Sequence, residues 1–189
     1  MTQSNTLKKP FYTGQEQAKV PHFSPNIACL MPARTLRCSI IEPTLCYLGV
    51  QSECASNLML GTLLAMAWLP TGKLHPEAIG PYGITPAMHT QLWDQYLAHQ
   101  PDLASLVRGL ASQRSFLQDP HAELAFNLAY ATAIAWMIYQ SSRPGLLEQQ
   151  DLSGLASLWQ QLYPHQGGLV EDFLGSWDMN HASQSIISA

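Results

Sequence analysis

The chain has 189 residues, of which 47% are apolar and only 12% charged, and its formal net charge is −4. This length is enough for one domain with a hydrophobic core. The charged fraction is about half the usual globular value, so we expect much of the surface to be covered in a larger assembly or against a membrane. The negative net charge argues against a nucleic-acid partner, which would need clustered lysine and arginine.

The four cysteines follow one another at intervals of eight or nine residues: Cys29, Cys38, Cys46 and Cys54. Structural zinc sites use pairs of ligands two to four residues apart, so this spacing does not match them. The sequence also has no phosphate-binding loop, no dinucleotide fingerprint and no histidine pair at metal spacing. We therefore expect no metal site and no cofactor, and we expect the four thiols to be buried and reduced.

The first 34 residues are predicted to form an extended arm. They contain four prolines and a few aromatic residues, and no hydrophobic period runs through them. A segment of this kind does not fold by itself, but its aromatic side chains can be buried on another protein. We expect residues 1–34 to contact neighbouring proteins; the alternative is a flexible terminus without a partner. We expect no signal peptide in this segment, because no apolar core follows Lys8 and Lys9.

The next part of the chain is predicted to be helical. Residues 35–48 form a helix with a kink at Pro43, and Gly49 ends it. Ser52 is a good N-cap for a second helix, which Pro70 stops. A loop rich in glycine and proline follows. It leads to a third helix, over residues 86–99, which Thr85 caps and Pro86 begins.

The second half of the chain also consists of predicted helices. One helix starts at Pro101, and Asp119-Pro120 is a strong start signal for another, which runs to about Gln140. That helix is apolar on nearly every face, so it is predicted to be the central buried helix of the fold. Further helices are predicted over residues 151–163 and 170–177, and a polar tail over residues 178–189. The predicted fold is all-α, with residues 35–177 as one domain.

Two stretches without any charge, Cys54–Gly72 and Leu124–Ser142, are long enough at about 20 residues to raise the question of membrane spans. Each carries several polar side chains. We expect both to be buried core helices, and we expect no membrane partner.

Three short motifs resemble those of a group of small, mostly phage-encoded proteins with a lysozyme-like, lytic transglycosylase-type fold. The resemblance covers about residues 36–177. The motifs are Leu60-Gly61-Thr62, the turn Gly80-x-Tyr82-x-Ile84-x-Pro86-x-x-His89, and Asn127-Leu128-Ala129-Tyr130-Ala131-Thr132-Ala133.

The resemblance implies a peptidoglycan-binding cleft in which two catalytic positions are replaced. In the family, a glutamate–serine pair after the leucine-glycine-threonine run supplies the catalytic acid. Here Met66 and Ala67 stand at those positions, and Gly83 stands where the family has glutamine. A thioether has no proton to give to a leaving oxygen. The expected degenerate cleft therefore consists of Met66, Gly80, Tyr82, Gly83 and His89, without a catalytic residue.

Alternatives remain for individual side chains near this cleft. Glu77, in the loop before Gly80, is the candidate for a substitute acid, or else a solvated loop residue. Tyr82 could stack on a sugar or simply pack in the core. His89 could bind a ligand or serve as a structural, hydrogen-bonded histidine.

The sequence thus predicts a non-catalytic structural component of a phage virion, in the internal core or the tail, made in the host cytoplasm. Its partners would be other virion proteins in a multi-copy assembly, and peptidoglycan is a further candidate. Two alternatives are an active peptidoglycan glycosidase that uses Glu77 and a membrane-inserting ejection protein.

Overall fold

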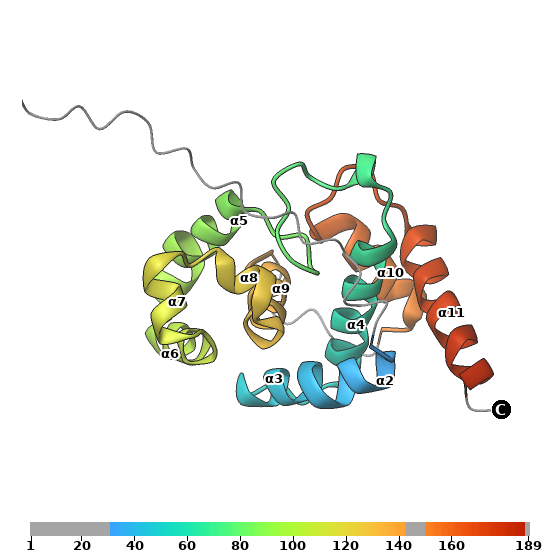
Figure 1. The fold of residues 1–189 in the computed structure, drawn as a ribbon, viewed down its shortest axis with the longest axis horizontal. Helices are drawn as coiled ribbons and strands as arrows, with labels where there is room; N and C mark the ends of the chain where they lie inside the picture. Colours follow the sequence, from blue (N-terminus) through green and yellow to red (C-terminus); the bar gives the residue numbers. More distant parts are fainter. Residues whose placement is uncertain (1–30, 143–149, 188–189) are drawn as a thin grey trace, which may run out of the picture.

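The computed structural model describes residues 31–142 and 150–187, and these residues confirm the predicted all-α class. Within them no β-strand is found, and an isolated bridge pairs Ile79 with Ile84. The helices, labelled as in Figure 1, are α2 (Ala33–Leu36), α3 (Glu42–Tyr47), α4 (Glu53–Trp68), α5 (Pro86–Gln91), α6 (Pro101–Leu110), α7 (Gln113–Gln118), α8 (Ala122–Phe126), α9 (Leu128–Ser142), α10 (Leu152–Leu162) and α11 (Val170–Ile187).

The first helical segment is continuous from α2 to α3, as predicted for residues 35–48. It begins two residues earlier, at Ala33, and a π-helical turn, Arg37–Ile41, joins its two α-helical parts. This turn lies directly before Pro43, which has no N–H to donate to the carbonyl four residues earlier. The predicted irregularity at the proline is therefore present as a π turn. Gly49 follows the segment with φ +81°, a conformation that favours glycine.

Helices α4 and α9 lie side by side in the middle of the molecule (Figure 1). Ser52 caps α4 as predicted, because its Oγ accepts a hydrogen bond from the Ala55 N–H at 3.3 Å. Nearly every residue of α4 from Ala55 to Ala67 is buried, and so is α9 from Tyr130 to Tyr139. The two uncharged stretches are thus buried core helices. None of the helices in the described ranges is both long and apolar enough to span a membrane.

The prediction of a single central helix from Asp119 to Gln140 is wrong, because the chain breaks at Asn127. This residue has an extended conformation, with φ −113° and ψ +94°, between α8 and α9. Its Oδ1 accepts from the Tyr130 N–H at 3.0 Å and caps α9, while its Nδ2 donates to the Leu110 carbonyl at 2.8 Å. The amide therefore ties the start of α9 to the end of α6, which a continuous helix would not allow.

Other boundaries also differ from the prediction. The helix predicted over residues 170–177 continues as α11 to Ile187, so most of the predicted polar tail is helical. No glycine or proline lies between Asp178 and Ile187, so nothing in the backbone stops the helix. The short helix α7 was not predicted, although Ser112 caps it through its Oγ. The helix predicted over residues 151–163 is confirmed as α10. The segment over residues 86–99 is helical throughout, but a π-helical turn, Leu92–Tyr96, and a 3-10 turn, Leu97–His99, follow α5.

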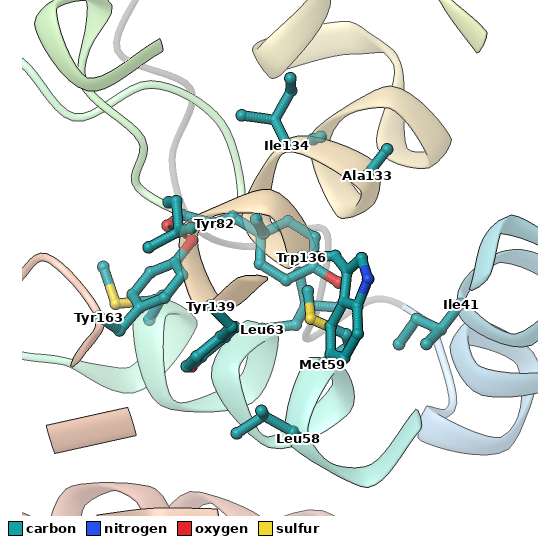
Figure 2. Packing of buried hydrophobic residues seen from close by; sticks show 14 of the residues in the cluster. Ile41, Leu58, Met59, Leu63, Tyr82, Ala133, Ile134, Trp136, Tyr139 and Tyr163 are labelled. Carbon is teal, nitrogen blue, oxygen red and sulfur yellow. Dashed lines mark hydrogen bonds between the residues drawn. The ribbon is translucent and has the colours of Figure 1, made fainter. Parts of the chain in front are cut away.

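Buried tyrosines, among them Tyr82, Tyr139 and Tyr163, lie in the core around the central helices (Figure 2). The hydroxyls of Thr62 on α4 and Tyr139 on α9 are 2.6 Å apart, and both side chains are fully buried. Tyr163, just after α10, donates to the Tyr82 carbonyl at 2.9 Å. The hydroxyls of Tyr82, Tyr139 and Tyr163 thus all have hydrogen-bond partners, whereas the indole nitrogen of the buried Trp159 has none among the described residues.

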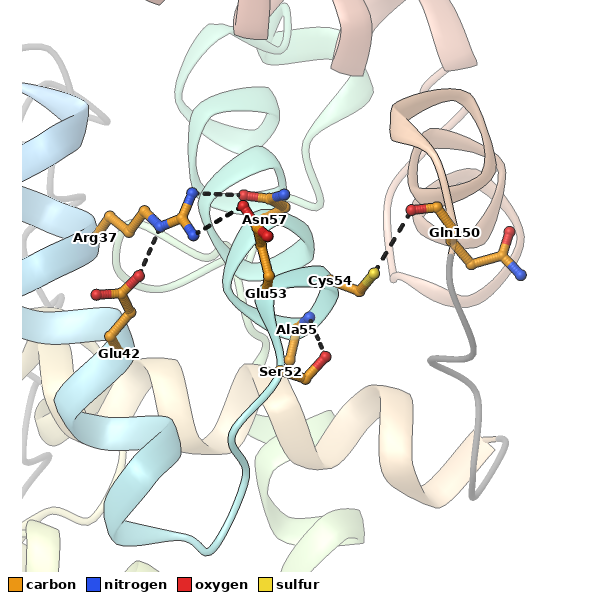
Figure 3. Close-up of polar contacts among 8 residues, drawn as sticks. All are labelled: Arg37, Glu42, Ser52, Glu53, Cys54, Ala55, Asn57 and Gln150. Atoms are coloured by element: carbon orange, nitrogen blue, oxygen red, sulfur yellow. Dashed lines mark hydrogen bonds and ion pairs between the residues drawn. The ribbon is translucent and has the colours of Figure 1, made fainter.

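The N-terminal end of α4 is held by polar contacts (Figure 3). Arg37 bonds Glu42 at 2.7 Å and Asn57 at 2.9 Å, and it lies 3.6 Å from Glu53. These contacts join the π turn to the first turns of α4.

The expectation of four buried thiols is wrong for those that the structure describes. Cys38 and Cys46 are exposed and Cys54 is half-buried, with its Sγ 3.6 Å from the Gln150 carbonyl. All three thiols are free. The fourth, Cys29, lies outside the described residues, as do nearly all residues of the predicted arm.

Candidate functional site

The structure places Met66 and Gly83 in contact. Met66 lies near the C-terminal end of α4 and is 2% exposed, and Gly83 lies in the turn between α4 and α5. A Cβ atom built on Gly83 would be 2.6 Å from the Met66 Cε atom. The Met66 methyl group therefore rests on the Gly83 backbone, and the two replaced positions face each other.

The turn that carries Gly83 is tight and closely packed. The backbone groups of Ile79 and Ile84 exchange two hydrogen bonds, at 3.0 and 3.1 Å, and close it. Gly80 and Gly83 have φ of +69° and +62°, which L side chains rarely adopt. A Cβ atom on Gly80 would also lie only 2.7 Å from the Leu124 carbonyl carbon. The backbone conformation at positions 80 and 83 therefore requires glycine.

Tyr82 is a core residue. Its side chain is fully buried, and its hydroxyl lies 3.2 Å from the Thr132 Oγ1 atom on α9. Burial raises the pKa of the Tyr82 hydroxyl well above its usual value. Of the two alternatives for this residue, packing is therefore correct, since the ring cannot stack on a sugar without leaving the core.

His89 belongs to a separate buried cluster between α5 and α9. It is 1% exposed, and its Nε2 atom is 2.7 Å from the Tyr130 hydroxyl, while its Nδ1 atom is 2.9 Å from His121 Nδ1. Trp93 donates its indole N–H to His89 Nε2 at 3.1 Å. Burial, and secondly the nearby His121, lower the pKa of His89 to about 4. His89 is therefore a neutral structural histidine with both ring nitrogens occupied.

Glu77, the candidate substitute acid, is exposed in the α4–α5 loop. Its backbone N–H donates to His75 Nδ1 at 3.2 Å, and no described residue bonds its carboxylate. A general acid for glycoside cleavage is normally held in a partly apolar pocket that raises its pKa. Glu77 has no such surroundings.

The predicted cleft residues line none of four surface cavities that described residues form. Surface cavities of about 660, 360, 640 and 330 Å³ are lined by described residues, and Met66, Tyr82 and Gly83 line none of these four. The structure thus brings Met66 and Gly83 together in the interior and places His89 elsewhere.

Sequence reasoning missed a buried carboxylate, Glu123 on α8. It is 3% exposed, and its Oε2 atom accepts from the Ser112 N–H at 3.1 Å and from Asn127 Nδ2 at 2.9 Å. It lines the cavity of about 660 Å³. The spacing of four residues between Glu123 and Asn127 was the available signal, because such pairs face each other on a helix.

Comparison with protein-family models, with curated proteins and with solved structures gave no match. Among the residues that the structure describes, no group of three histidine, cysteine, aspartate or glutamate side chains could hold a metal ion.

Proposed function

We propose that this chain is a non-catalytic structural component of a phage virion, in the internal core or the tail, built on a degenerate lysozyme-like helical domain. The family part of this proposal rests on the resemblance of the three motifs, and the helical class agrees with it. The fold alone does not set the role, since one fold carries many functions.

The contact between Met66 and Gly83 carries the proposal. If the motifs are aligned correctly, the positions of the catalytic acid and of the glutamine must lie next to each other, although 17 residues separate them in the sequence. The Met66 methyl group lies against Gly83 in the structure, which agrees with that alignment. Both positions are filled by apolar packing, because Met66 is only 2% exposed.

A site of this composition cannot perform general acid catalysis. A thioether carries no proton, and the loss of a general acid alone removes on the order of 10² to 10⁴ in rate. Gly83 could not simply be replaced by glutamine either. Its φ of +62° and the nearby Met66 Cε atom both oppose a side chain there. Restoring activity would therefore require the turn to be rebuilt.

An active peptidoglycan glycosidase that uses Glu77 is the first alternative. It is less well supported, because Glu77 is exposed and lacks the apolar pocket that a general acid needs. A membrane-inserting ejection protein is the second alternative. Both uncharged stretches are buried in helices of the core, so insertion would require the domain to open.

An assembly role also fits the composition and the predicted partners. The low charge favours a surface covered by other proteins, and residues 1–34 are the segment that we expect to contact them. We expect a location in the virion after synthesis in the host cytoplasm, and many copies per particle.

The assembly role can be tested on purified particles of a phage that encodes the chain. Cross-linking and mass spectrometry should find the chain in the particle, with cross-links from Lys8, Lys9 or Lys19 to other virion proteins. If the chain is absent from washed particles, the assignment to the virion is wrong. A variant without residues 1–30 is the matched control and should be lost from the particle while the helical domain remains folded by circular dichroism.

A further inference from the structure

One surface cavity in the described part of the chain is not lined by Met66 or Gly83. It has a volume of about 660 Å³ and is formed between α3 and the segment from the end of α6 to the start of α9. Tyr47, Ser112, Glu123 and Asn127 are among its lining residues. We call it the Glu123 cavity.

One oxygen of the Glu123 carboxylate accepts hydrogen bonds, and the other has no donor among the described residues. Both of its hydrogen bonds, from the Ser112 N–H and from Asn127 Nδ2, go to Oε2. No described residue donates to Oε1 or forms an ion pair with this carboxylate. Glu123 is nevertheless 97% buried, since only 3% of it is exposed. Oε1 is not one of the described side-chain atoms that are both buried and without a partner, so it keeps contact with solvent. It can therefore accept a hydrogen bond from a donor that enters the cavity.

The neighbouring amide cannot supply that donor. Asn127 Nδ2 already donates to Glu123 Oε2 and to the Leu110 carbonyl, and its Oδ1 accepts from the Tyr130 N–H. The hydrogen-bonding groups of Asn127 are therefore committed to holding α8, α9 and α6 together. Asn127 fixes the orientation of the carboxylate, and the oxygen that remains for a ligand belongs to Glu123.

The charge around the cavity selects the kind of ligand. Among its described lining residues Glu123 is the only charged one, and no lysine, arginine or histidine lines it. An anion would find no positive partner there and would be repelled by the carboxylate. A cation would gain both an opposite charge and a hydrogen bond to Oε1.

The walls suit an apolar body next to the charged group. Ile40, Leu110 and Leu128 contribute aliphatic surface, and the ring of Tyr47 is 47% exposed at the rim. The Tyr47 hydroxyl lies against α6, since a Cβ atom on Gly109 would be 2.6 Å from it. Tyr47 and Glu123 line the same cavity, and an aromatic ring with a carboxylate is a favourable setting for an organic cation.

We infer that the Glu123 cavity is a binding site for an ammonium or guanidinium group carried on an apolar body. The cation donates to Glu123 Oε1, and the apolar part lies on the aliphatic wall and the Tyr47 ring. The group can come from a free amine or from the basic side chain of a peptide. This site is separate from the Met66–Gly83 contact, so the inference holds whether or not the chain is a virion component.

The test is a binding titration of the full chain, followed by NMR and calorimetry, with two pairs of probes. The first pair is 2-phenylethylamine, a cation at neutral pH, and neutral 2-phenylethanol. The second is acetyl-phenylalanyl-arginine amide and the same peptide with citrulline. We expect the cationic member of at least one pair to bind about 10- to 100-fold more tightly than its neutral counterpart, the usual range for a hydrogen bond to a charged group. The pair that binds more tightly identifies the source of the cation.

Two variants locate the effect. Glu123→Gln can keep the bonds from Ser112 and Asn127 through its carbonyl oxygen while presenting an NH₂ group where Oε1 was. It should remove the preference for the cation, whereas Glu77→Gln, the same change at an exposed loop position, should leave it unchanged. Tyr47→Ala, at the exposed rim, should weaken binding of the cationic probe several-fold. It replaces Glu123→Gln as the test of the site if that variant does not fold.

The inference is overturned if charged and neutral probes bind equally or not at all, or if a folded Glu123→Gln variant keeps the preference. Shifts of the Ser112 and Asn127 amide signals must accompany binding. Binding that shifts only distant residues counts against the site.

Discussion

The packing of Gly61 against Phe173 leads to a quantitative prediction for Gly61→Ala. Gly61 is in the middle of α4, within the leucine-glycine-threonine run, and a Cβ atom there would lie 2.6 Å from the Phe173 Cε1 and Cε2 atoms. Carbon atoms of this kind normally approach no closer than 3.4 Å. Phe173 on α11 is fully buried, so its ring cannot turn into solvent. The added methyl group must therefore push α11 away from α4.

Two opposing effects set the magnitude. Replacing glycine by alanine inside a helix normally stabilises it by about 1 kcal/mol. Overpacking a core costs about 1 to 3 kcal/mol. We expect Gly61→Ala to be net destabilising by up to about 2 kcal/mol. Gly175→Ala is the matched control, because no atom lies within 4 Å of the Cβ position at Gly175 on α11. It should stabilise the protein by up to about 1 kcal/mol.

The assay is urea denaturation followed by circular dichroism. In a Phe173→Leu background the penalty at Gly61 should shrink, giving a coupling energy of about 1 kcal/mol or more between the two positions. If Gly61→Ala stabilises the protein as much as Gly175→Ala does, the close packing of α4 on α11 is wrong.

Three further predictions concern buried polar groups. Tyr139→Phe leaves the Thr62 hydroxyl buried without its partner 2.6 Å away, so it should lower the unfolding free energy by about 1 to 3 kcal/mol, and adding Thr62→Val should recover part of that loss in urea titrations. His89 has its pKa lowered from 6.5 to about 4, so the unfolded chain binds more protons between these values. The stability present above pH 6.5 should fall as the pH drops towards 4, by about 3 kcal/mol at most, and a His89→Gln variant measured over the same range should lack this component. Asn127→Ala removes the cap of α9 and the bond to the Leu110 carbonyl, and should cost about 1 to 3 kcal/mol by thermal or urea unfolding; a loss below about 0.5 kcal/mol would contradict the role assigned to this amide.

The helices that the sequence predicted well have their signals close by in the chain. Ser52 and Pro70 bound α4, and Thr85 with Pro86 begins α5, because caps and prolines act within one turn of the backbone. The break at Asn127 has a different origin. Its side chain bonds the Leu110 carbonyl, 17 residues earlier, and no local pattern reveals that contact. An apolar run on both sides of the asparagine instead suggested one continuous helix.

The candidate site was predictable only in part. The motif alignment pointed to Met66 and Gly83 together, and the structure brings them into contact. The burial of Glu123 was not predicted, because the residues around it come from the Ser112 loop and from α3, which are distant in sequence. An acidic residue near the start of a predicted helix is normally solvated and favoured by the helix dipole, so the four-residue spacing to Asn127 is the local sign that this one has a partner.

The most direct test of the central claim is the release of muropeptides from purified peptidoglycan by the full chain, measured by liquid chromatography and mass spectrometry. Our account predicts that the wild-type protein releases no more than buffer does, and that a folded Glu77→Gln variant is indistinguishable from it. Release of muropeptides by the wild-type protein that is abolished by Glu77→Gln would contradict the non-catalytic assignment and establish the exposed loop carboxylate as the acid.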